Sequence, residues 1–240
     1  MQLIPIRKKY IYERLERKDL PEGRVYMVDT TPLPSVTRIL SDTKDRTALD
    51  AWAAKVGQDT ADKIKNDAAT VGTHMHNVVE RLLLNRDLPV PRTWLSVKGY
   101  WMGYKLIENF FPNVQEVWGA EVPLYYPEKY AGTSDCIAVY KGKPSILDFK
   151  QANKMKQRKW IDDYFIQLAA YALAHDIVHG TEIDQGVILM VAQDGQVQEF
   201  VTCGREFDGY KDMWMRRVEI FQKNAPATLL GQSTVPRGEA

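Results

Sequence analysis

The chain has 240 residues, 45% of them hydrophobic and 26% charged, and its formal net charge is +1. This length suits one domain, or one domain with an elaborated subdomain. No stretch reaches the roughly 18 apolar residues of a transmembrane helix, and two cysteines without framework spacing exclude a disulfide scaffold and indicate a reducing compartment. The small net charge leaves nucleic-acid binding open, because local clusters of charge decide it.

Hydrophobic periodicity, capping residues and breakers predict the elements in chain order. A short strand is expected at 24–29, and Pro32 and Pro34 end it before Ser35 caps a helix. The elements predict an α/β (α+β) fold with a mixed central sheet flanked by helices in α-β-β-β-α-β order, preceded by a helical region. The further elements are helices at 35–41, 45–66, 69–85 and 93–111, strands at 117–126, 133–140 and 143–151, a helix at 160–179, strands at 186–193 and 196–203 joined over Asp194-Gly195, and a closing helix at 206–223.

Two acidic residues lie on neighbouring strands of this predicted sheet. If Lys141-Gly142 is a two-residue hairpin loop, Asp135 faces Asp148 and Thr133 faces Lys150. Carboxylates this close destabilise a sheet unless a cation lies between them, and that cation is either Lys150 or a divalent metal. A register slip of one residue would move Asp148 to the other face, and the simpler alternative is a pair of solvated surface charges.

Two helices carry polar pairs that are one turn apart. His76 and Glu80 share a side of the 69–85 helix, which suits a divalent metal or an ordinary surface pair, whereas His74 is expected to be a bystander. Gln167 and Tyr171 lie on an otherwise apolar helix. Their pairing predicts either a functional role or a satisfied hydrogen bond in the core.

A basic run follows the second acidic strand and ends at an aromatic residue. Its members after Lys150 are Lys154, Lys156, Arg158, Lys159 and Trp160. Such a run suits phosphate contacts and base stacking, and the alternative is a solvated connector. Aromatic residues in the 93–111 helix could also stack bases, although aromatics at helical spacing usually belong to a core; they are Trp94, Tyr100, Trp101 and Tyr104.

Together these motifs resemble a nuclease family. The order Gly72-x-x-x-His76-x-x-x-Glu80, Gly132-x-x-Asp135, Asp148-x-Lys150 and Gln167-x-x-x-Tyr171 resembles RecB-type nucleases of the PD-(D/E)XK superfamily. The longer stretches at 135–150 and 167–171, with the Pro-Ser-Val-Thr sequence within 33–40, are similar to the mitochondrial genome maintenance exonucleases and their bacteriophage relatives. The resemblance spans roughly residues 30–180.

The resemblance implies a role for each matching residue. His76, Asp135, Asp148 and the backbone carbonyl of Phe149 would hold one or two Mg²⁺ or Mn²⁺ ions, and Lys150 would orient or deprotonate the attacking water. Glu80 would support the metal ligands, Gln167 and Tyr171 would position the strand to be cut, and Gly72 and Gly132 would permit close backbone approach. The residues expected to bind DNA are Lys154, Lys156, Arg158, Lys159, Trp160, Thr133 and Ser134. Two cysteines are too few for the four-cysteine iron–sulfur cluster of many RecB-type relatives.

These roles predict a metal-dependent DNA exonuclease that prefers single strands or flap ends and acts as a monomer without a membrane partner. Residues 1–30 are expected to form an N-terminal segment, 31–224 one nuclease domain and 225–240 a tail, with helices at about 35–112, a sheet core at about 117–203 and a closing helix at 206–223. Acidic residues within 1–20 argue against a transit peptide, so we expect a bacterial or phage-infected cytoplasm. The alternatives are a silent nucleic-acid-binding protein, an endonuclease, a structural or partner-binding domain, and RNA as substrate.

Overall fold

A computed structural model describes residues 6, 7 and 9–224. The N-terminal part forms a small antiparallel sheet in the order β1-β2-β3, from β1 (Glu16–Leu20), β2 (Gly23–Val28) and β3 (Thr31–Pro34). Of these strands only β2 was predicted, and it ends at Val28, ahead of the prolines; the strand β3, which contains Pro32 and Pro34, was not predicted. Proline is tolerated in β3 because this strand lies at an edge of its sheet.

Helices follow this small sheet. The Ser35 side chain caps α1 (Val36–Asp42), as predicted, by accepting from the backbone N–H of Arg38 at 3.1 Å. Gly57, with φ of 87°, separates α2 (Thr47–Val56) from α3 (Gln58–Leu83). The predicted boundaries here were wrong: the break lies inside the expected 45–66 helix, and α3 continues through the expected gap at 67–68. Thr93 then caps α4 (Trp94–Phe110) with a capping box.

The main sheet has five strands in the order β4-β5-β6-β7-β8. Among the pairings of these described strands, only that of β6 with β7 is parallel, because the crossover helix α5 connects the two, so the sheet is mixed as predicted. The order α-β-β-β-α-β is also confirmed. The bounds are β4 (Val114–Tyr126), β5 (Tyr130–Tyr140), β6 (Lys143–Ala152), β7 (Gln185–Ala192), β8 (Val197–Cys203), α5 (Asp162–His179) and α6 (Arg205–Asn224), with short 3-10 helices at Phe111–Asn113 and Arg158–Trp160.

The β5–β6 hairpin has the predicted register over its paired part. Lys141 and Gly142 have φ angles of 49° and 82°, as a tight two-residue loop requires. Ile137 pairs with Ile146 and Cys136 with Leu147, as predicted. The β5–β6 ladder ends at Cys136 and Leu147, whereas β6 continues to pair with β7 as far as Ala152. Before Cys136, the residues of β5 therefore pair with β4 alone. After Leu147, the residues of β6 pair with β7 alone.

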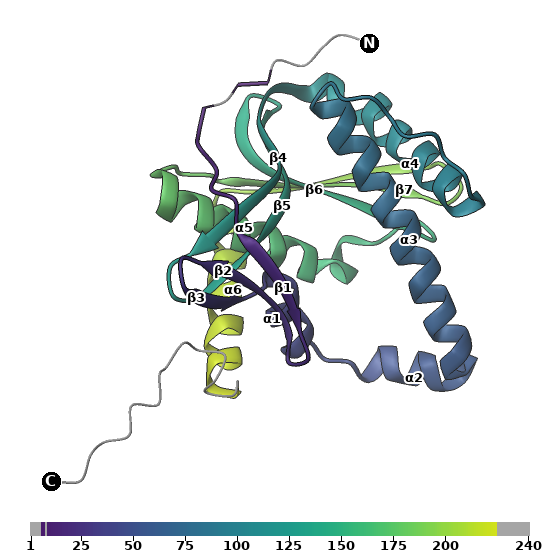
Figure 1. Ribbon diagram of the computed structural model, residues 1–240, viewed down its shortest axis with the longest axis horizontal. Helices are drawn as coiled ribbons and strands as arrows, with labels where there is room; N and C mark the ends of the chain where they lie inside the picture. The colour runs from purple at the N-terminus through teal and green to yellow at the C-terminus, as the bar shows by residue number, and fades with distance from the viewer. Residues whose placement is uncertain (1–5, 8, 225–240) are drawn as a thin grey trace, which may run out of the picture.

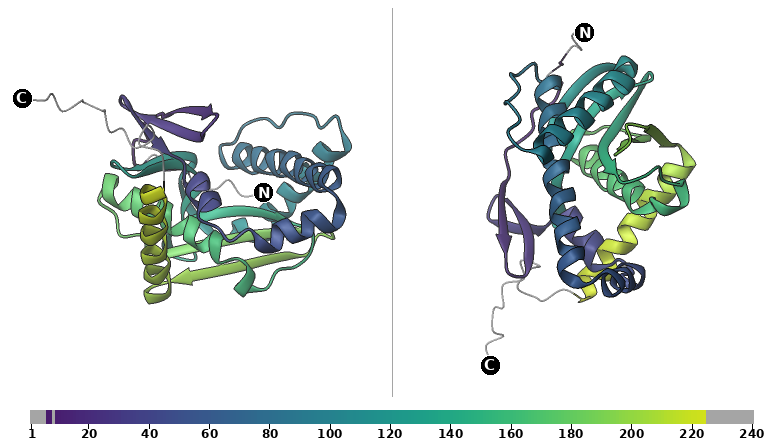
Figure 2. Two further views of the ribbon diagram at one scale, coloured as in Figure 1. Left: turned by 90° about the horizontal axis from the view of Figure 1, so that it is seen from below. Right: turned by 90° about the vertical axis from the view of Figure 1, so that its right-hand side faces the viewer.

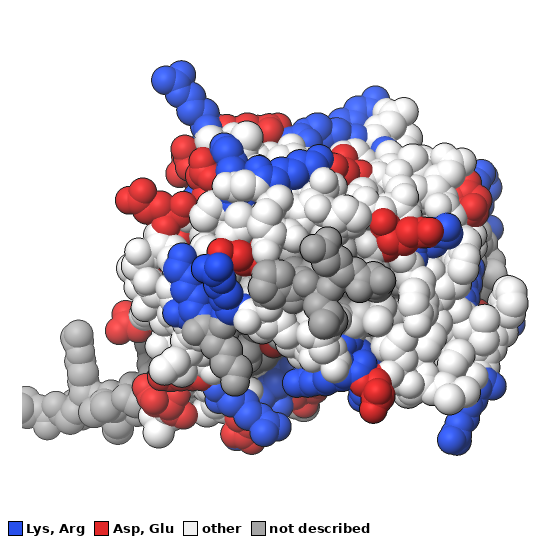
Figure 3. Space-filling view, turned by 90° about the horizontal axis from the view of Figure 1, so that it is seen from above, with Lys and Arg blue, Asp and Glu red and all other residues white. Residues whose placement is uncertain are grey.

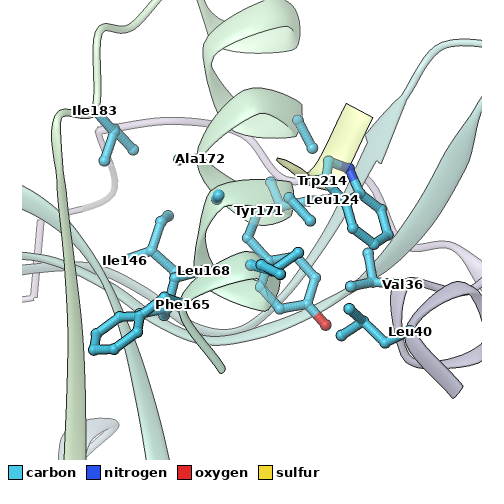
Figure 4. Close-up of a cluster of buried hydrophobic side chains, with 14 of the residues drawn as sticks. Val36, Leu40, Leu124, Ile146, Phe165, Leu168, Tyr171, Ala172, Ile183 and Trp214 are labelled. Carbon is cyan, nitrogen blue, oxygen red and sulfur yellow. The ribbon is translucent and has the colours of Figure 1, made fainter. Parts of the chain in front are cut away.

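Helices cover both faces of the main sheet (Figure 1; Figure 2). On one face, α3 and α4 pack together closely: a Cβ atom added at Gly99 would lie 2.5 Å from the Cβ of His74. On the other face, α5, α6 and α1 enclose the larger hydrophobic cluster, part of which Figure 4 shows around Leu168 and Trp214. Both faces of β5 and β6 are therefore buried, as the sequence predicted. Among the described residues, no helix has both the length and the apolar character needed to cross a membrane.

Candidate active site

Asp135 lies where β5 separates from β6. Its Oδ2 atom accepts a hydrogen bond from the backbone N–H of Phe149 at 2.8 Å, so this side chain takes the place that a neighbouring strand would fill. In a β-strand the N–H and C=O groups of one residue point to the same edge. The Phe149 carbonyl therefore lies on the same edge of β6 as the N–H that Asp135 binds, as a role in metal binding would require.

Asp148 and Lys150 form a buried ion pair on β6. Asp148 is 2% exposed, and the Nζ atom of Lys150 lies 2.7 Å from its Oδ1 and 2.6 Å from its Oδ2. Lys150 donates a hydrogen bond to Oδ1, whereas Oδ2 accepts none of proper geometry among the described residues. Oδ2 is thus buried beside a cation but accepts no further hydrogen bond from the described residues.

Burial and charge set the protonation of this pair. Burial raises the pKa of Asp148 to about 6, with a further contribution from Asp135, although Lys150 opposes the shift. Burial would lower the pKa of Lys150, but the carboxylates of Asp148 and Asp135 outweigh it and raise that pKa. At neutral pH we therefore assign a carboxylate to Asp148 and an ammonium group to Lys150.

His76 reaches the acidic group from α3. Its Nδ1 atom lies 3.4 Å from Oδ2 of Asp135. Ligand atoms of His76, Asp135 and Glu121 all lie within 4.8 Å of one another. The helix on one face of the sheet and two adjacent strands thus bring an imidazole and two carboxylates to one point.

The sequence alone did not identify Glu121. It lies in β4 between Ala120 and Val122, which pair with Cys136 and Ser134, so it is the cross-strand neighbour of Asp135. Its φ angle is 50°, which is uncommon for a residue other than glycine and is often found at functional sites. The pairing of β4 with β5 is regular from Tyr126 and Tyr130 back to Gly119 and Ile137, so counting from the turn at 127–129 identifies Glu121. The sequence prediction began the second strand at 133 and therefore did not define this turn.

Crowded carboxylates perturb Glu121. Desolvation, then the charges of Asp135, Glu80 and Asp148, raise its pKa to about 8. The residue as a whole remains exposed, so desolvation is incomplete, and we give the neighbouring negative charges more weight. With a pKa of about 8, Glu121 is mainly protonated at neutral pH, and a metal ion at the cluster would displace that proton and offset the charges of Asp135 and Asp148.

Glu80 and His74 lie outside the group of clustered ligands formed by His76, Glu121 and Asp135. Glu80 forms an ion pair with Arg86 at 3.1 Å and is not one of the three clustered ligands, although its charge reaches Glu121. This position fits a supporting role better than direct coordination. His74 packs its Cβ atom against Gly99 of α4, in agreement with the expectation that it is a bystander.

Tyr171 of α5 lies beside the acidic group and is buried, among the side chains shown in Figure 4. Its hydroxyl oxygen would lie 3.2 Å from a Cβ atom at Gly132, so glycine permits the close approach predicted there. Burial raises the Tyr171 pKa, Gln167 lowers it by hydrogen bonding, and Asp135 adds to the rise. The expectation for Gly72 was wrong, because no atom lies within 4 Å of a Cβ atom placed there.

The basic run has two kinds of member. Arg158 binds Glu206 at 2.7 Å and the Val201 carbonyl at 3.0 Å, and its guanidinium lies 4.3 Å from the centre of the Phe165 ring. These contacts hold Arg158 in the fold, so it does not fit the predicted DNA-binding role. The other members are exposed, namely Lys154, Lys156, Lys159 and Trp160.

Two further residues expected to bind DNA lie on β5. The Thr133 hydroxyl lies 3.2 Å from the hydroxyl of Tyr26, at the small N-terminal sheet. Ser134 is 0% exposed, and its hydroxyl has no partner among the described residues. The prediction that Ser134 contacts DNA is therefore wrong for its side chain, whereas Thr133 is partly accessible.

The aromatic residues of α4 lie mainly on its outer side. Trp94, Trp101 and Tyr104 are 75%, 41% and 47% exposed. The expectation that most of these aromatics belong to the core was wrong for these three. Figure 3 shows a broad uncharged area on the side where Figure 1 places α3 and α4, while charges of both signs are dispersed elsewhere on that face.

The residues present fit a divalent metal ion. Carboxylate oxygens with one imidazole nitrogen are ligands that Mg²⁺ and Mn²⁺ accept, and Oδ2 of Asp148 is a buried carboxylate oxygen without a hydrogen-bond donor among the described residues. Cys136 is fully buried, and burial raises the pKa of its thiol, so a soft thiolate ligand is not available from it. The arrangement can therefore hold a hard cation beside a buried lysine.

Known proteins resemble this chain in sequence. No family model matches it. Mitochondrial genome maintenance exonuclease 1 of Mus musculus is 26% identical over 211 residues, 81% of this chain and 61% of the relative. The Xenopus tropicalis protein of the same name is 28% identical over 215 residues, 84% of this chain and 60% of the relative. The chain thus spans about three fifths of the length of these curated relatives.

A solved structure of a proposed exonuclease from Eubacterium rectale aligns with 65% of this chain and 65% of its own, with a TM-score of 0.45 and 11% sequence identity. Because the sequence matches cover 81% and 84% of this chain, they include the segment from His76 to Tyr171. The chain is thus similar in sequence to mitochondrial genome maintenance exonuclease 1 over a stretch that includes Asp135, Asp148 and Lys150 of its mixed sheet.

Proposed function

We propose that this protein is a metal-dependent DNA exonuclease. The observation that carries the proposal is the buried Asp148–Lys150 pair beside the clustered His76, Glu121 and Asp135. Its relatives are named as exonucleases, and their names support this activity over that of an endonuclease. The cluster has an excess of carboxylates that a structural ion pair does not need.

Hydrolysis forms one bond from the oxygen of water to phosphorus and breaks the bond from phosphorus to a sugar oxygen, which receives a proton and leaves as a hydroxyl. One or two Mg²⁺ or Mn²⁺ ions, when bound, supply Lewis-acid activation of water and offset charge on the phosphate oxygens. His76, Asp135, Asp148, Glu121 and the Phe149 carbonyl are the proposed ligands.

Lys150 has the proposed role of orienting the attacking water. Because the nearby carboxylates raise its pKa, it is an ammonium group at neutral pH and donates hydrogen bonds. It can therefore position water and stabilise negative charge that develops on phosphate oxygens. Tyr171 and Gln167 would hold the strand to be cut from the α5 side, and Glu80 would support the ligands through the charge it adds.

Single strands or flap ends are the proposed substrates. His76 belongs to α3, so this helix lies directly over the carboxylates. A single strand can enter beneath a helix more easily than a duplex can. The exposed Lys154, Lys156, Lys159 and Trp160 follow β6 and are proposed to contact the strand by charge and stacking.

The test is cleavage of end-labelled single-stranded and duplex DNA with Mg²⁺ or with a chelator. We expect stepwise, metal-dependent shortening of single strands and no shortening by Lys150→Ala. Lys143→Ala is the matched control, because Lys143 lies at the other end of the same strand and is exposed. DNA that stays intact with the unaltered protein would contradict the enzyme and favour a silent nucleic-acid-binding protein.

A further inference from the structure

An open groove of about 630 Å³ lies between the N-terminal sheet and the β4–β5 ribbon. Its polar lining comes from Arg14, Glu16, Arg17, Tyr26 and Thr133, and Pro123 contributes an apolar part. Pro123 and Thr133 are direct cross-strand partners, and the Tyr26 hydroxyl lies 3.2 Å from that of Thr133. The small N-terminal sheet and the main sheet, which are separate sheets, thus form one concave surface.

This groove continues from the candidate active site. Thr133 and Asp135 are two residues apart on β5, so their side chains leave the same face of the strand about 6.6–6.8 Å apart. Tyr171 lies against the same part of β5, since its hydroxyl would be 3.2 Å from a Cβ atom placed at Gly132, the residue before Thr133. Figure 2 shows the β1–β2 hairpin and the α3–α4 pair standing apart on the same side of the sheet.

Two guanidinium groups give the groove its charge. Arg14 is exposed and has no ion-pair partner within 4.0 Å among the described residues. Arg17 lies 3.3 Å from Asp19, and the one carboxylate of the lining, Glu16, lies 3.3 Å from Lys18. The acidic residue is thus neutralised from outside the groove, whereas Arg14 remains available to an anion.

We propose that this groove binds the phosphodiester backbone of the substrate strand next to the bond that is cut, with Arg14 as the principal contact and Arg17 as the second. The proposal rests on the proposed nuclease function and adds a binding site to it. A guanidinium can bind a phosphate through two parallel hydrogen bonds, and the Tyr26 and Thr133 hydroxyls can donate to neighbouring oxygens.

Phosphate contacts of this kind position a strand without reading its sequence. Arg14 lies outside the reacting cluster, so it should act on binding of a strand and not on the chemical step. A small diester such as bis(p-nitrophenyl) phosphate has no neighbouring phosphate and cannot reach the groove and the active site at once. The two substrates therefore separate groove binding from catalysis.

The experiment compares the unaltered protein with Arg14→Ala, Arg14→Lys and Arg14→Ala/Arg17→Ala. We expect Arg14→Ala to raise KM for a single-stranded oligonucleotide about 10-fold with kcat unchanged, and the double variant to raise it further. The dependence of log affinity on log salt should become shallower by about 0.7 for each phosphate that a variant no longer binds. Hydrolysis of bis(p-nitrophenyl) phosphate should not change, and Arg14→Lys should restore part of the affinity.

Arg216→Ala is the control, because Arg216 is exposed on α6 and does not line the groove. An oligonucleotide KM and a salt dependence that stay unaltered in the double variant would overturn the groove proposal while leaving the nuclease intact. Failure of the unaltered protein to hydrolyse either substrate would instead contradict the proposed function. In that case fluorescence anisotropy with labelled single-stranded DNA still decides the groove: equal affinity of the unaltered protein and the double variant overturns it.

Discussion

Two clusters of polar side chains lie against α5 and β4–β6, and they differ in how completely their charges are matched. Around His175, Tyr12 lies 3.2 Å from Nε2 and Thr181 lies 2.7 Å from Nδ1. Thr181 in turn donates to Asp176 at 2.7 Å, and Asp176 also accepts from the N–H of Ile183 and from Lys211. Each ring nitrogen and the Asp176 carboxylate therefore has a partner.

Around Asp135 the balance is different. Four acidic residues, Glu80, Glu121, Asp135 and Asp148, influence one another, and Lys150 pairs with Asp148. Oδ2 of Asp148 accepts no properly formed hydrogen bond among the described residues. A satisfied polar cluster stabilises and specifies a fold, whereas an unbalanced one is stable only if another group completes it. From this contrast we expect changes at the His175 cluster to act on stability and changes at the Asp135 cluster to act on activity.

The largest expected effect is on activity at the unbalanced cluster. We expect Asp135→Asn to lower cleavage of single-stranded DNA by about 10³-fold, roughly 4 kcal/mol of transition-state stabilisation, because a metal ligand is removed. The amide oxygen can still accept from the Phe149 N–H, and one repelling charge is removed, so stability without metal should not fall. Steady-state cleavage and thermal unfolding in chelator measure the two effects. A variant with full activity would contradict the assignment of Asp135.

The opposite pattern is expected at the satisfied cluster. Asp176→Ala leaves the N–H of Ile183 and the Thr181 hydroxyl without their acceptor, and Lys211 loses its ion-pair partner while it still donates to the Ile183 carbonyl at 2.8 Å. We expect the free energy of unfolding to fall by about 2–4 kcal/mol, while cleavage by the folded protein is unchanged. Urea denaturation measures the loss, with Asp212→Ala as the control because Asp212 is exposed. Loss of activity without loss of stability would remove the distinction between the clusters.

Metal addition should stabilise only through the unbalanced cluster. At a Mn²⁺ concentration 100 times its Kd, we expect about 2.7 kcal/mol of stabilisation, or a rise in Tm of roughly 5–10 °C. Glu121→Gln should reduce this rise, because one ligand charge is removed, whereas Asp212→Asn should retain it. Calorimetric unfolding with and without Mn²⁺ is the measurement. A Tm that does not respond to Mn²⁺ would favour a structural role for the acidic residues.

The smallest expected effect is the pH dependence at His175. Burial, then the charges of His179 and Lys9, lower its pKa from 6.5 to about 3, and Tyr12 and Thr181 face the ring. The unfolded chain therefore binds a proton more readily than the folded chain, and stability present above pH 6.5 is lost as pH falls toward 3. At pH 5 the loss is about 2 kcal/mol. His175→Gln should flatten this dependence in denaturation measured from pH 7 to 5, whereas His74→Gln should not.

Local sequence was sufficient to predict the turn and the register of the β5–β6 hairpin. Lys141-Gly142 specifies a tight loop, and the loop specifies the register of Ile137 with Ile146. This register does not indicate where the pairing of β5 with β6 ends. In the structure it ends at Cys136 and Leu147, while β5 remains paired with β4. Asp135 therefore binds the Phe149 N–H and does not simply oppose Asp148. Direct opposition was predicted, and the structure replaces it with this side-chain to backbone contact.

Two further features of the site region were not predicted from local sequence. Glu121 joins the site because β4 and β5 pair regularly from the turn at 127–129 back to Gly119, whereas the predicted strands at 117–126 and 133–140 left that turn undefined. The β1 strand consists of exposed residues, so no alternation of apolar and polar side chains marks it. Its pairing with β2 nevertheless places Arg14 and Arg17 beside Thr133. The second feature requires contacts between segments that are distant in the sequence.

The end of the β5–β6 ladder also makes one backbone proton a reporter of the site. The Phe149 amide is held by a carboxylate oxygen, whereas most amides of a sheet are held by carbonyls. Its chemical shift and its rate of exchange with solvent deuterium should therefore respond to any charge placed on Asp135. Nuclear magnetic resonance of this single amide can follow occupancy of the acidic cluster without DNA and without turnover.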